Sequence, residues 1–204
     1  MEKTNDRALI VLVRKGEATR GIILEEAGRL ARQVGLSGLT IGSLATQTEL
    51  SKSGLFAHFG SKESLQLQLL EYTSERFIAT VVRPAVKEPR GEPRVRALFE
   101  NWLHWAAANG GCLLVASMFE LDDQPGPVRD RLVSDQRDWL DTIATVFTSG
   151  VTEGQFRPDV DPRQFAQDML GVMLAFHVAN RLLADPEAAT RARRALDVLI
   201  DAAR

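Results

Sequence analysis

Residues 40–65 read TIGSLATQTELSKSGLFAHFGSKESL. Two short amphipathic segments lie in this stretch, one beginning after Thr40 and one over residues 52–58, and a short turn separates them. This spacing predicts a helix-turn-helix. Helices this short are marginal in water by themselves, so they must pack on the preceding helix. We expect the core of the three-helix unit to be formed by apolar side chains, namely Ile41, Leu44, Ala45, Leu50, Leu55 and Phe59.

The second short helix leaves small, polar and basic side chains for its exposed side. These are Ser51, Lys52, Ser53, Gly54, Ala57 and His58. A recognition helix needs such side chains, because they reach base edges without blocking entry to the major groove of DNA. Thr40, Ser61 and Lys62 place hydroxyls and a cation at helix starts, where phosphates dock. The competing interpretation is a helical hairpin with an ordinary solvated face.

The chain on either side of this stretch is also helical in its pattern. Over residues 19–34, Ile23, Ala27, Leu30 and Val34 recur on one face, and Gly35 is a plausible end. After Ser61, which we expect to cap the next helix, the apolar pattern continues until Pro84. Domain boundaries are therefore expected at residues 1–65 for the helix-turn-helix domain, with 1–16 as an extension, and at 66–204 for a larger domain.

The larger domain shows helical periodicity almost throughout. Helices are predicted over residues 95–108, 112–121, 128–153, 161–183 and 188–203. Asp161, Pro162 and Gln164 form a helix start with a capping Asp and a proline at the first helical position. No segment of real length alternates with period two, so we predict an all-α fold of about nine helices.

The composition excludes several classes of protein. The 204 residues are 45% hydrophobic and 25% charged, which is typical of a globular chain and not of a disordered one. No apolar run approaches the roughly 20 residues of a membrane helix, and no signal peptide is expected. The net charge of −2 gives no overall nucleic-acid signal. The single cysteine, Cys112, cannot form an internal disulfide, so we expect a cytoplasmic protein.

A resemblance to a known family is carried by about 47 consecutive residues, from Thr19 to Leu65. The pattern begins with a first helix that ends at Gly35. It continues through Leu39-Thr40-Ile41, Leu50-Ser51-Lys52, His58-Phe59 and Ser61-Lys62-Glu63. This succession is similar to the N-terminal domain of the TetR family of bacterial transcriptional regulators. The all-α remainder agrees with the larger regulatory domain of that family.

The resemblance implies roles for single residues. Ser51, Lys52, Ser53 and Gly54 would open the recognition helix, Phe56 and His58 would approach the DNA backbone, and Thr40 and Lys62 would lie beside phosphates. Two positions depart from the family pattern. Phe56 stands where Tyr is commoner and has no hydroxyl to donate to a phosphate, and Glu49 stands in the turn where Gly is frequent.

The resemblance further implies a homodimer, a near-palindromic double-stranded DNA operator and a small-molecule effector that releases a repressor. For the dimer, the sequence itself offers a row of small residues flanked by apolar stripes on the last two helices. These residues are Gly171, Ala175 and Ala179, with Phe165, Met169, Val172 and Phe176 beside them, and Ala192, Ala195 and Leu199 on the final helix. The alternative is that both stripes belong to the core of a single chain.

Aromatic and methionine side chains are candidates for binding an apolar or aromatic effector. They are Trp102, Trp105, Met118, Phe119, Phe147, Met173 and His177. Their helical spacing favours ordinary core for most of them. We expect no metal, no cofactor and no enzyme activity, because metal-ligand spacing, a P-loop, a dinucleotide fingerprint and a nucleophile elbow are all missing from the sequence.

Two alternative functions stay open from the sequence. Cys112 follows Gly110-Gly111 at a predicted helix start, where a thiol can become reactive, so the same scaffold could serve as a redox sensor. The other alternative is a helical small-molecule-binding protein or enzyme with no role on DNA.

Overall fold

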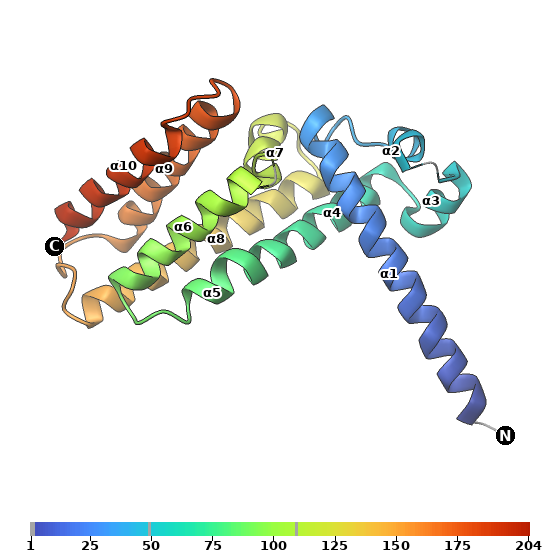
Figure 1. The fold of residues 1–204 in the computed structure, drawn as a ribbon, viewed down its shortest axis with the longest axis horizontal. Helices are drawn as coiled ribbons and strands as arrows, with labels where there is room; N and C mark the ends of the chain where they lie inside the picture. The colour runs from blue at the N-terminus through green and yellow to red at the C-terminus, as the bar shows by residue number, and fades with distance from the viewer. Residues whose placement is uncertain (1–2, 49, 109) are drawn as a thin grey trace. The chain divides into compact units, whose positions relative to one another are not determined.

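The computed structural model describes residues 3–48, 50–108 and 110–204, with side chains from residue 19 onward. In these residues the regular structure is helical and there is no strand, which confirms the predicted all-α class. Figure 1 shows the succession of helices along the chain.

The chain divides into two compact units, Met1–Thr73 and Ser74–Arg204. The division falls inside one helix. The functional boundary expected after residue 65 concerns DNA binding and ligand binding, and it stays a prediction.

The first unit is built from α1 (Lys3–Val34), α2 (Ile41–Thr48), α3 (Lys52–Phe59) and the first part of α4 (Lys62–Phe77). Its core contains apolar side chains from all four helices, including Ile23, Ala27, Leu30, Leu44, Ala45, Leu55, Phe59, Leu65 and Leu69. Helix α2 packs against α1 and α3 packs against α2, so the short helices bury their apolar faces in one unit with the preceding helix, as the pattern predicts.

Two residues expected in this core are exposed instead, Val34 by 48% and Leu50 by 42%. Val34 is the last residue of α1, where Gly35 adopts a φ of 80° and turns the chain away. Leu36 and Leu39 of the following loop are fully buried in this core. Leu50 lies in the turn before α3, outside the helical period that would aim it inward.

Helix α4 continues without a break through a π-helical turn, Ile78–Val82, into the short α5, Arg83–Ala85. The backbone N–H of Arg83 donates to the carbonyl of Ile78, five residues back. A proline ring clashes with the carbonyl four residues back in an α-helix, and the wider π turn gives Pro84 room. The helix thus ends near Pro84, as predicted. When α4, the π turn and α5 are counted as one continuous helix, the described residues contain nine helices.

The second unit contains α6 (Glu92–Ala108), α7 (Leu113–Leu121), α8 (Pro127–Thr152), α9 (Pro162–Arg181) and α10 (Ala188–Ala203). Helix α9 packs against both α8 and α10. The Asp161 carboxylate accepts a hydrogen bond from the Arg163 N–H over 2.9 Å, so the predicted cap of α9 is confirmed. Phe147 stacks on Phe156 and on Phe165, with ring centroids 4.5 and 4.3 Å apart.

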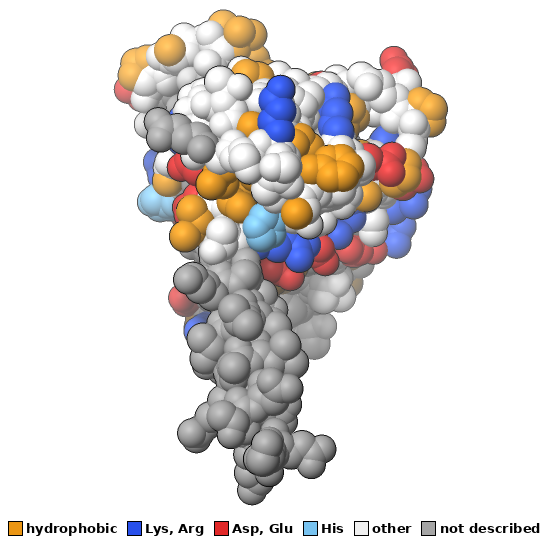
Figure 2. Space-filling model, turned by 90° about the vertical axis from the view of Figure 1, so that its right-hand side faces the viewer, with side chains coloured by type: hydrophobic (Ala, Val, Ile, Leu, Met, Phe, Trp, Pro, Cys, Tyr) orange, Lys and Arg blue, Asp and Glu red, His pale blue; other side chains and the backbone are white. Residues whose placement is uncertain are grey.

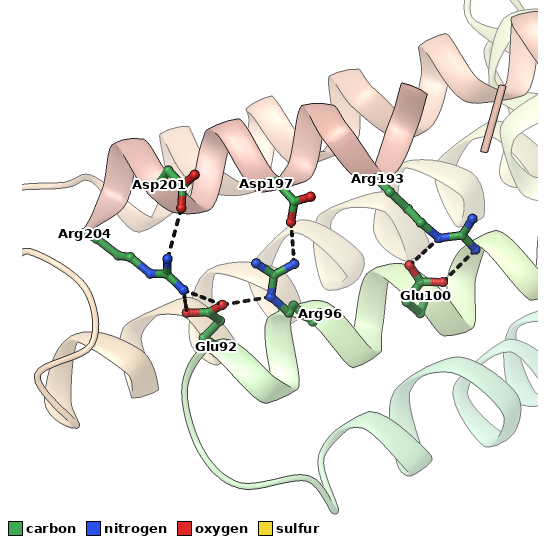
Figure 3. Close-up of polar contacts among 7 residues, drawn as sticks. All are labelled: Glu92, Arg96, Glu100, Arg193, Asp197, Asp201 and Arg204. Carbon is green, nitrogen blue, oxygen red and sulfur yellow. Dashed lines mark hydrogen bonds and ion pairs between the residues drawn. The ribbon is translucent and has the colours of Figure 1, made fainter. Parts of the chain in front are cut away.

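A row of ion pairs joins α6 to α10 (Figure 3). Arg96 contacts Asp197 over 2.6 Å, Arg193 contacts Glu100 over 2.7 Å, and Arg204 contacts Glu92 over 2.6 Å. Hydrogen bonds from Arg204 and from Arg96 hold the pKa of Glu92 below its ordinary value of 4.5. Single exposed pairs contribute little, but a network of several fixes the register of the two helices.

Candidate nucleic-acid interface and ligand cavity

Helices α2, α3 and α4 each begin at a hydroxyl side chain that caps the helix. Thr40 Oγ1 accepts from the Ser43 N–H over 3.0 Å, while Ser43 Oγ accepts from the Thr40 N–H over 2.9 Å. Ser51 Oγ accepts from the Gly54 N–H over 3.1 Å, and Ser61 Oγ from the Ser64 N–H over 3.0 Å. These caps fix where each helix starts, because they satisfy N–H groups that have no partner within the helix.

The caps change the interpretation of Ser51. The sequence assigns it to base reading, but its hydroxyl oxygen is engaged inside the motif with Gly54, and Ser53 Oγ lies 3.3 Å away. A Cβ at Gly54 would come within 3.0 Å of Ser51 Oγ, so glycine suits this close approach. Ser51 thus positions α3 first, and its hydroxyl also shares a hydrogen bond with that of Ser53.

The outward face of α3 carries the predicted DNA-contacting set. Ser51, Lys52, Ser53, Gly54, Phe56, Ala57 and His58 are exposed. Leu55 and Phe59 point into the core. Phe56 is 59% exposed, so its ring is accessible to a partner. In Figure 2, which views the side of the molecule where α3 lies, Lys or Arg and histidine side chains stand among uncharged and apolar ones.

Two side chains of α4 hold the loop between α1 and α2. Lys62 Nζ donates to the Ser37 carbonyl over 2.5 Å, and Gln66 Nε2 donates to the Leu36 carbonyl over 2.6 Å. Gln66 is buried, and the sequence pattern gave no sign of its role because a polar residue on a helix usually faces solvent. Lys62 is exposed beyond this bond, so its charge remains accessible to an anion. Glu49, the other departure from the family pattern, lies outside the described residues.

A cavity of about 280 Å³ lies within the second unit. Its walls come from α4 and the π turn, α6, α7, α8 and α9, and they are mostly apolar: Phe77, Ile78, Val82, Trp102, Cys112, Leu114, Val115, Trp139 and Leu170. Polar groups line it as well, from Ser74 and from Asp135, Gln136, Asp138 and Thr142 on α8. An apolar cavity with a few polar groups is the usual form of a small-molecule site.

The cavity contains one of the residues predicted to bind an effector, Trp102. Met118 lines a neighbouring groove of about 310 Å³ instead. Trp105, Phe147 and Met173 are buried elsewhere in the core.

The last two predicted effector-binding residues also lie off the cavity wall. Phe119 is 59% exposed, and burial, followed by the charge of Arg181, lowers the pKa of His177. Sequence reasoning missed Phe77 and Trp139, whose rings meet edge to face with centroids 5.0 Å apart. Their helical spacing looks like ordinary core, and only packing leaves a void beside them.

The ten residues predicted for a dimer interface fall into two sets. Phe165, Met169, Phe176 and Ala192 are buried within the single chain. Gly171 and Ala175 are exposed, and Val172, Ala179, Ala195 and Leu199 are partly exposed. A Cβ at Gly171 would meet nothing within 4 Å. The apolar face of α9 extends through two residues that the sequence analysis did not select, Val178 at 44% and Leu182 at 78% exposure.

Other chemistry in the described part of the chain is sparse. Cys112 is 2% exposed and lies on the cavity wall. The described His, Cys, Asp and Glu side chains form no group that could hold a metal ion. Among the helices described, none combines the length and the apolar character needed to cross a membrane.

Two segments of the sequence match models of known protein families. Residues 23–69 match the bacterial regulatory proteins of the tetR family, and residues 91–196 match the tetracyclin repressor-like C-terminal domain. The HTH-type transcriptional repressor KstR2 of Mycobacterium tuberculosis is 28% identical over 148 residues, covering 70% of this chain and 71% of that protein. The nucleoid occlusion factor SlmA of Vibrio vulnificus is 27% identical over 119 residues, which is 58% of this chain and 61% of SlmA.

Solved structures show the same fold. A TetR transcriptional regulator from Chloroflexus aurantiacus superposes with a TM-score of 0.77 at 28% identity, covering 92% of this chain and 95% of that one. A TetR-family regulator from Streptomyces coelicolor superposes with a TM-score of 0.78 at 19% identity, covering 90% of this chain and 95% of that one. Both of these solved structures are of transcriptional regulators. The two family models cover the helix-turn-helix and most of the larger domain, and the chain belongs to the TetR family of bacterial transcriptional regulators.

Proposed function

We propose that the protein is a homodimeric repressor that binds a near-palindromic operator and is released from it by a small apolar or aromatic effector. It would act where the DNA is, in the cytoplasm. The observation that carries the proposal is the outward face of α3, on which small, polar and basic side chains stand on a helix fixed by the Ser51 cap and by buried Leu55 and Phe59. Such a helix can enter a major groove.

The electrostatics of this face favour a phosphate backbone. Lys52 and Lys62 are exposed at the starts of α3 and α4, where helix N-termini also attract anions. Phe56 has no hydroxyl for a phosphate, so its exposed ring would contact sugars or a thymine methyl group. Backbone contacts position the protein on DNA, and contacts from Ser51, Lys52 and Ser53 would select the sequence.

The cavity offers a route for control by an effector. Phe77 at the end of α4, together with Ile78 and Val82 of the π turn, forms part of its wall. The same helix begins at Lys62, in the helix-turn-helix unit. A ligand that binds one arrangement of α4 more tightly than another would shift the population between DNA-binding and free states. Solved relatives include AibR in complex with isovaleryl coenzyme A and operator DNA, and a FadR from Bacillus subtilis in complex with stearoyl-CoA.

The dimer is supported by the exposed apolar face of α9 and α10. Gly171, Ala175, Val178 and Leu182 recur on one side of α9, and Val198 on α10 is 62% exposed. Exposed apolar rows on adjacent helices are typical of a four-helix interface between two identical chains.

The test is footprinting on the DNA upstream of the chain's own coding sequence. The expected result is a protected near-palindrome with half-site centres about one helical turn apart, or a multiple of it. Protection of a single asymmetric half-site, saturated by a monomer, would contradict the proposal.

A second candidate function is thiol-based sensing, which the position of Cys112 on the cavity wall favours. An oxidant or electrophile would have to enter the cavity to reach Sγ, because the residue is 2% exposed. Loss of operator binding on treatment with diamide, absent in Cys112→Ser, would favour this candidate. Unchanged binding would remove it.

A further inference from the structure

We infer that the cavity of the second unit selects an effector with a one- or two-ring apolar body and a cationic or hydrogen-bond-donating group, and that it rejects carboxylates. This inference rests on the proposed function, since it names the chemical class of the proposed effector. It is carried by the distribution of charge around the cavity.

The apolar part of the ligand is defined by the walls. The rings of Phe77, Trp102 and Trp139 come from α4, α6 and α8, and aliphatic side chains of α7 and the π turn complete the surface. At about 280 Å³ the cavity lies at the small end of ligand sites, so it suits a compact ring system rather than a long chain. Tryptophan faces also attract cations.

The polar part of the lining consists largely of acceptors. Asp135 Oδ2 accepts a hydrogen bond from Ser74 Oγ over 2.9 Å, and its Oδ1 accepts one from Arg131 Nε over 2.9 Å. These two bonds fix the orientation of the Asp135 carboxylate against the cavity. Asp138, one turn further along α8, also lines the cavity, and no described cation pairs with it.

No lysine, arginine or histidine is found among the fourteen described residues that line the cavity. A ligand carboxylate would therefore lose hydration beside the Asp138 carboxylate, which no described cation pairs, and beside Asp135, whose charge is already offset by Arg131. No lysine, arginine or histidine of the lining is left to pair with the ligand. A ligand ammonium or N–H donor would instead find Asp138 as a partner. The sign of the charge on the lining thus sets the class of ligand.

Arg131, which lies outside the lining, is engaged with Asp135 over 2.9 Å, and further arginines lie in the neighbouring groove. This groove shares Gln136 with the cavity and is lined by Arg129 and Arg137. An anionic ligand could be bound only by reaching out of the cavity to these arginines, and a variant at Arg137 detects that case.

The experiment compares three ligands with one body: 2-naphthylmethylamine, 2-naphthylmethanol and 2-naphthoate, titrated calorimetrically into the full chain at pH 7. We expect the amine to bind at least tenfold more tightly than the carboxylate, with the alcohol between them. Asp138→Asn should weaken the amine about tenfold and leave the alcohol unchanged. Asp141→Asn is the matched control, because Asp141 is exposed on the same helix outside the cavity lining.

The inference is overturned if the carboxylate binds as tightly as the amine, if Asp138→Asn leaves amine binding unchanged, or if none of the three ligands binds. Carboxylate binding that is lost in Arg137→Gln would assign the head group to the groove and would also overturn it. A gel shift with the upstream DNA is run on the same protein. A chain that binds its operator but fails the titration refutes the inference alone, and a chain that fails to bind DNA refutes the proposed function.

Discussion

The Lys62 ammonium donates a hydrogen bond to the carbonyl oxygen of Ser37 over 2.5 Å, tying the start of α4 to the loop between α1 and α2. The side chain that we propose as a phosphate contact is therefore also part of the scaffold that presents α2. An exposed lysine can serve both purposes, because its ammonium group has three donors.

Lys62→Ala should weaken binding to all DNA sequences, since one phosphate contact is lost. The slope of log affinity against log salt concentration should become shallower by about one unit. Lys52→Ala should instead change which bases are preferred, because Lys52 lies on the outward face of α3. Affinities measured over a salt series with operator and unrelated DNA separate the two. An unchanged slope for Lys62→Ala would show that the Lys62 ammonium bonds the Ser37 carbonyl and contacts no phosphate.

Ser51→Ala should lower the free energy of unfolding by about 1 kcal/mol, because the Gly54 N–H loses its capping partner. Urea unfolding followed by circular dichroism measures the change. Ser53→Ala is the control, since its hydroxyl accepts no backbone N–H in the described structure. Equal stability of Ser51→Ala and wild type would mean that the cap contributes nothing in solution.

Ala175→Arg should give a folded monomer that no longer binds the operator. Ala175 is exposed on the chain by itself, so arginine fits the protomer, but a close interface would bury an unpaired charge at a cost of several kcal/mol. Sedimentation and circular dichroism together provide the measurement.

Ala107→Arg, at an exposed alanine of α6 outside the proposed interface, serves as the control for the added charge and should remain dimeric. Met169→Arg should unfold the domain, because Met169 is fully buried. An Ala175→Arg protein that is still a dimer on its operator would remove α9 from the interface.

The ion pairs of Glu92 should make stability depend on pH in the acid range. Its pKa is lowered in the folded chain, chiefly by the hydrogen bond from Arg204, so the folded state holds the proton less tightly than the unfolded state. The stabilisation is present above about pH 4.5 and is lost as the pH falls through the lowered pKa of the folded chain.

Glu92→Gln should therefore be less stable than wild type at pH 7 and should lose less stability on acidification. Urea unfolding at pH 7, 4 and 3 tests this. Glu75→Gln, at an exposed glutamate of α4, should follow the wild-type curve. If the free energy of unfolding of Glu92→Gln fell in parallel with that of wild type as the pH is lowered, the Glu92 ion pairs would not be the source of the pH dependence.

The sequence by itself determined the class of fold and the place of the helix-turn-helix. Local signals suffice for this, since hydrophobic period, capping hydroxyls and glycine or proline ends act over a few residues. Thr40, Ser61 and Asp161 each cap a helix start, as the sequence predicts, whereas the Ser51 cap emerged only from the structure. Leu50 and Val34 were misplaced because the helical period does not hold in turns and at helix ends.

Only the tertiary structure decided which side chains line the cavity and which part of the apolar stripes stays exposed. Phe77, Trp102 and Asp135 come from three helices far apart in sequence, and a void between them depends on how those helices pack. Met169 and Ala175 carry the same apolar signal on one helix, yet Met169 is buried and Ala175 is exposed. Periodicity defines the faces of a helix, but the neighbours that cover each face are chosen by contacts between distant segments.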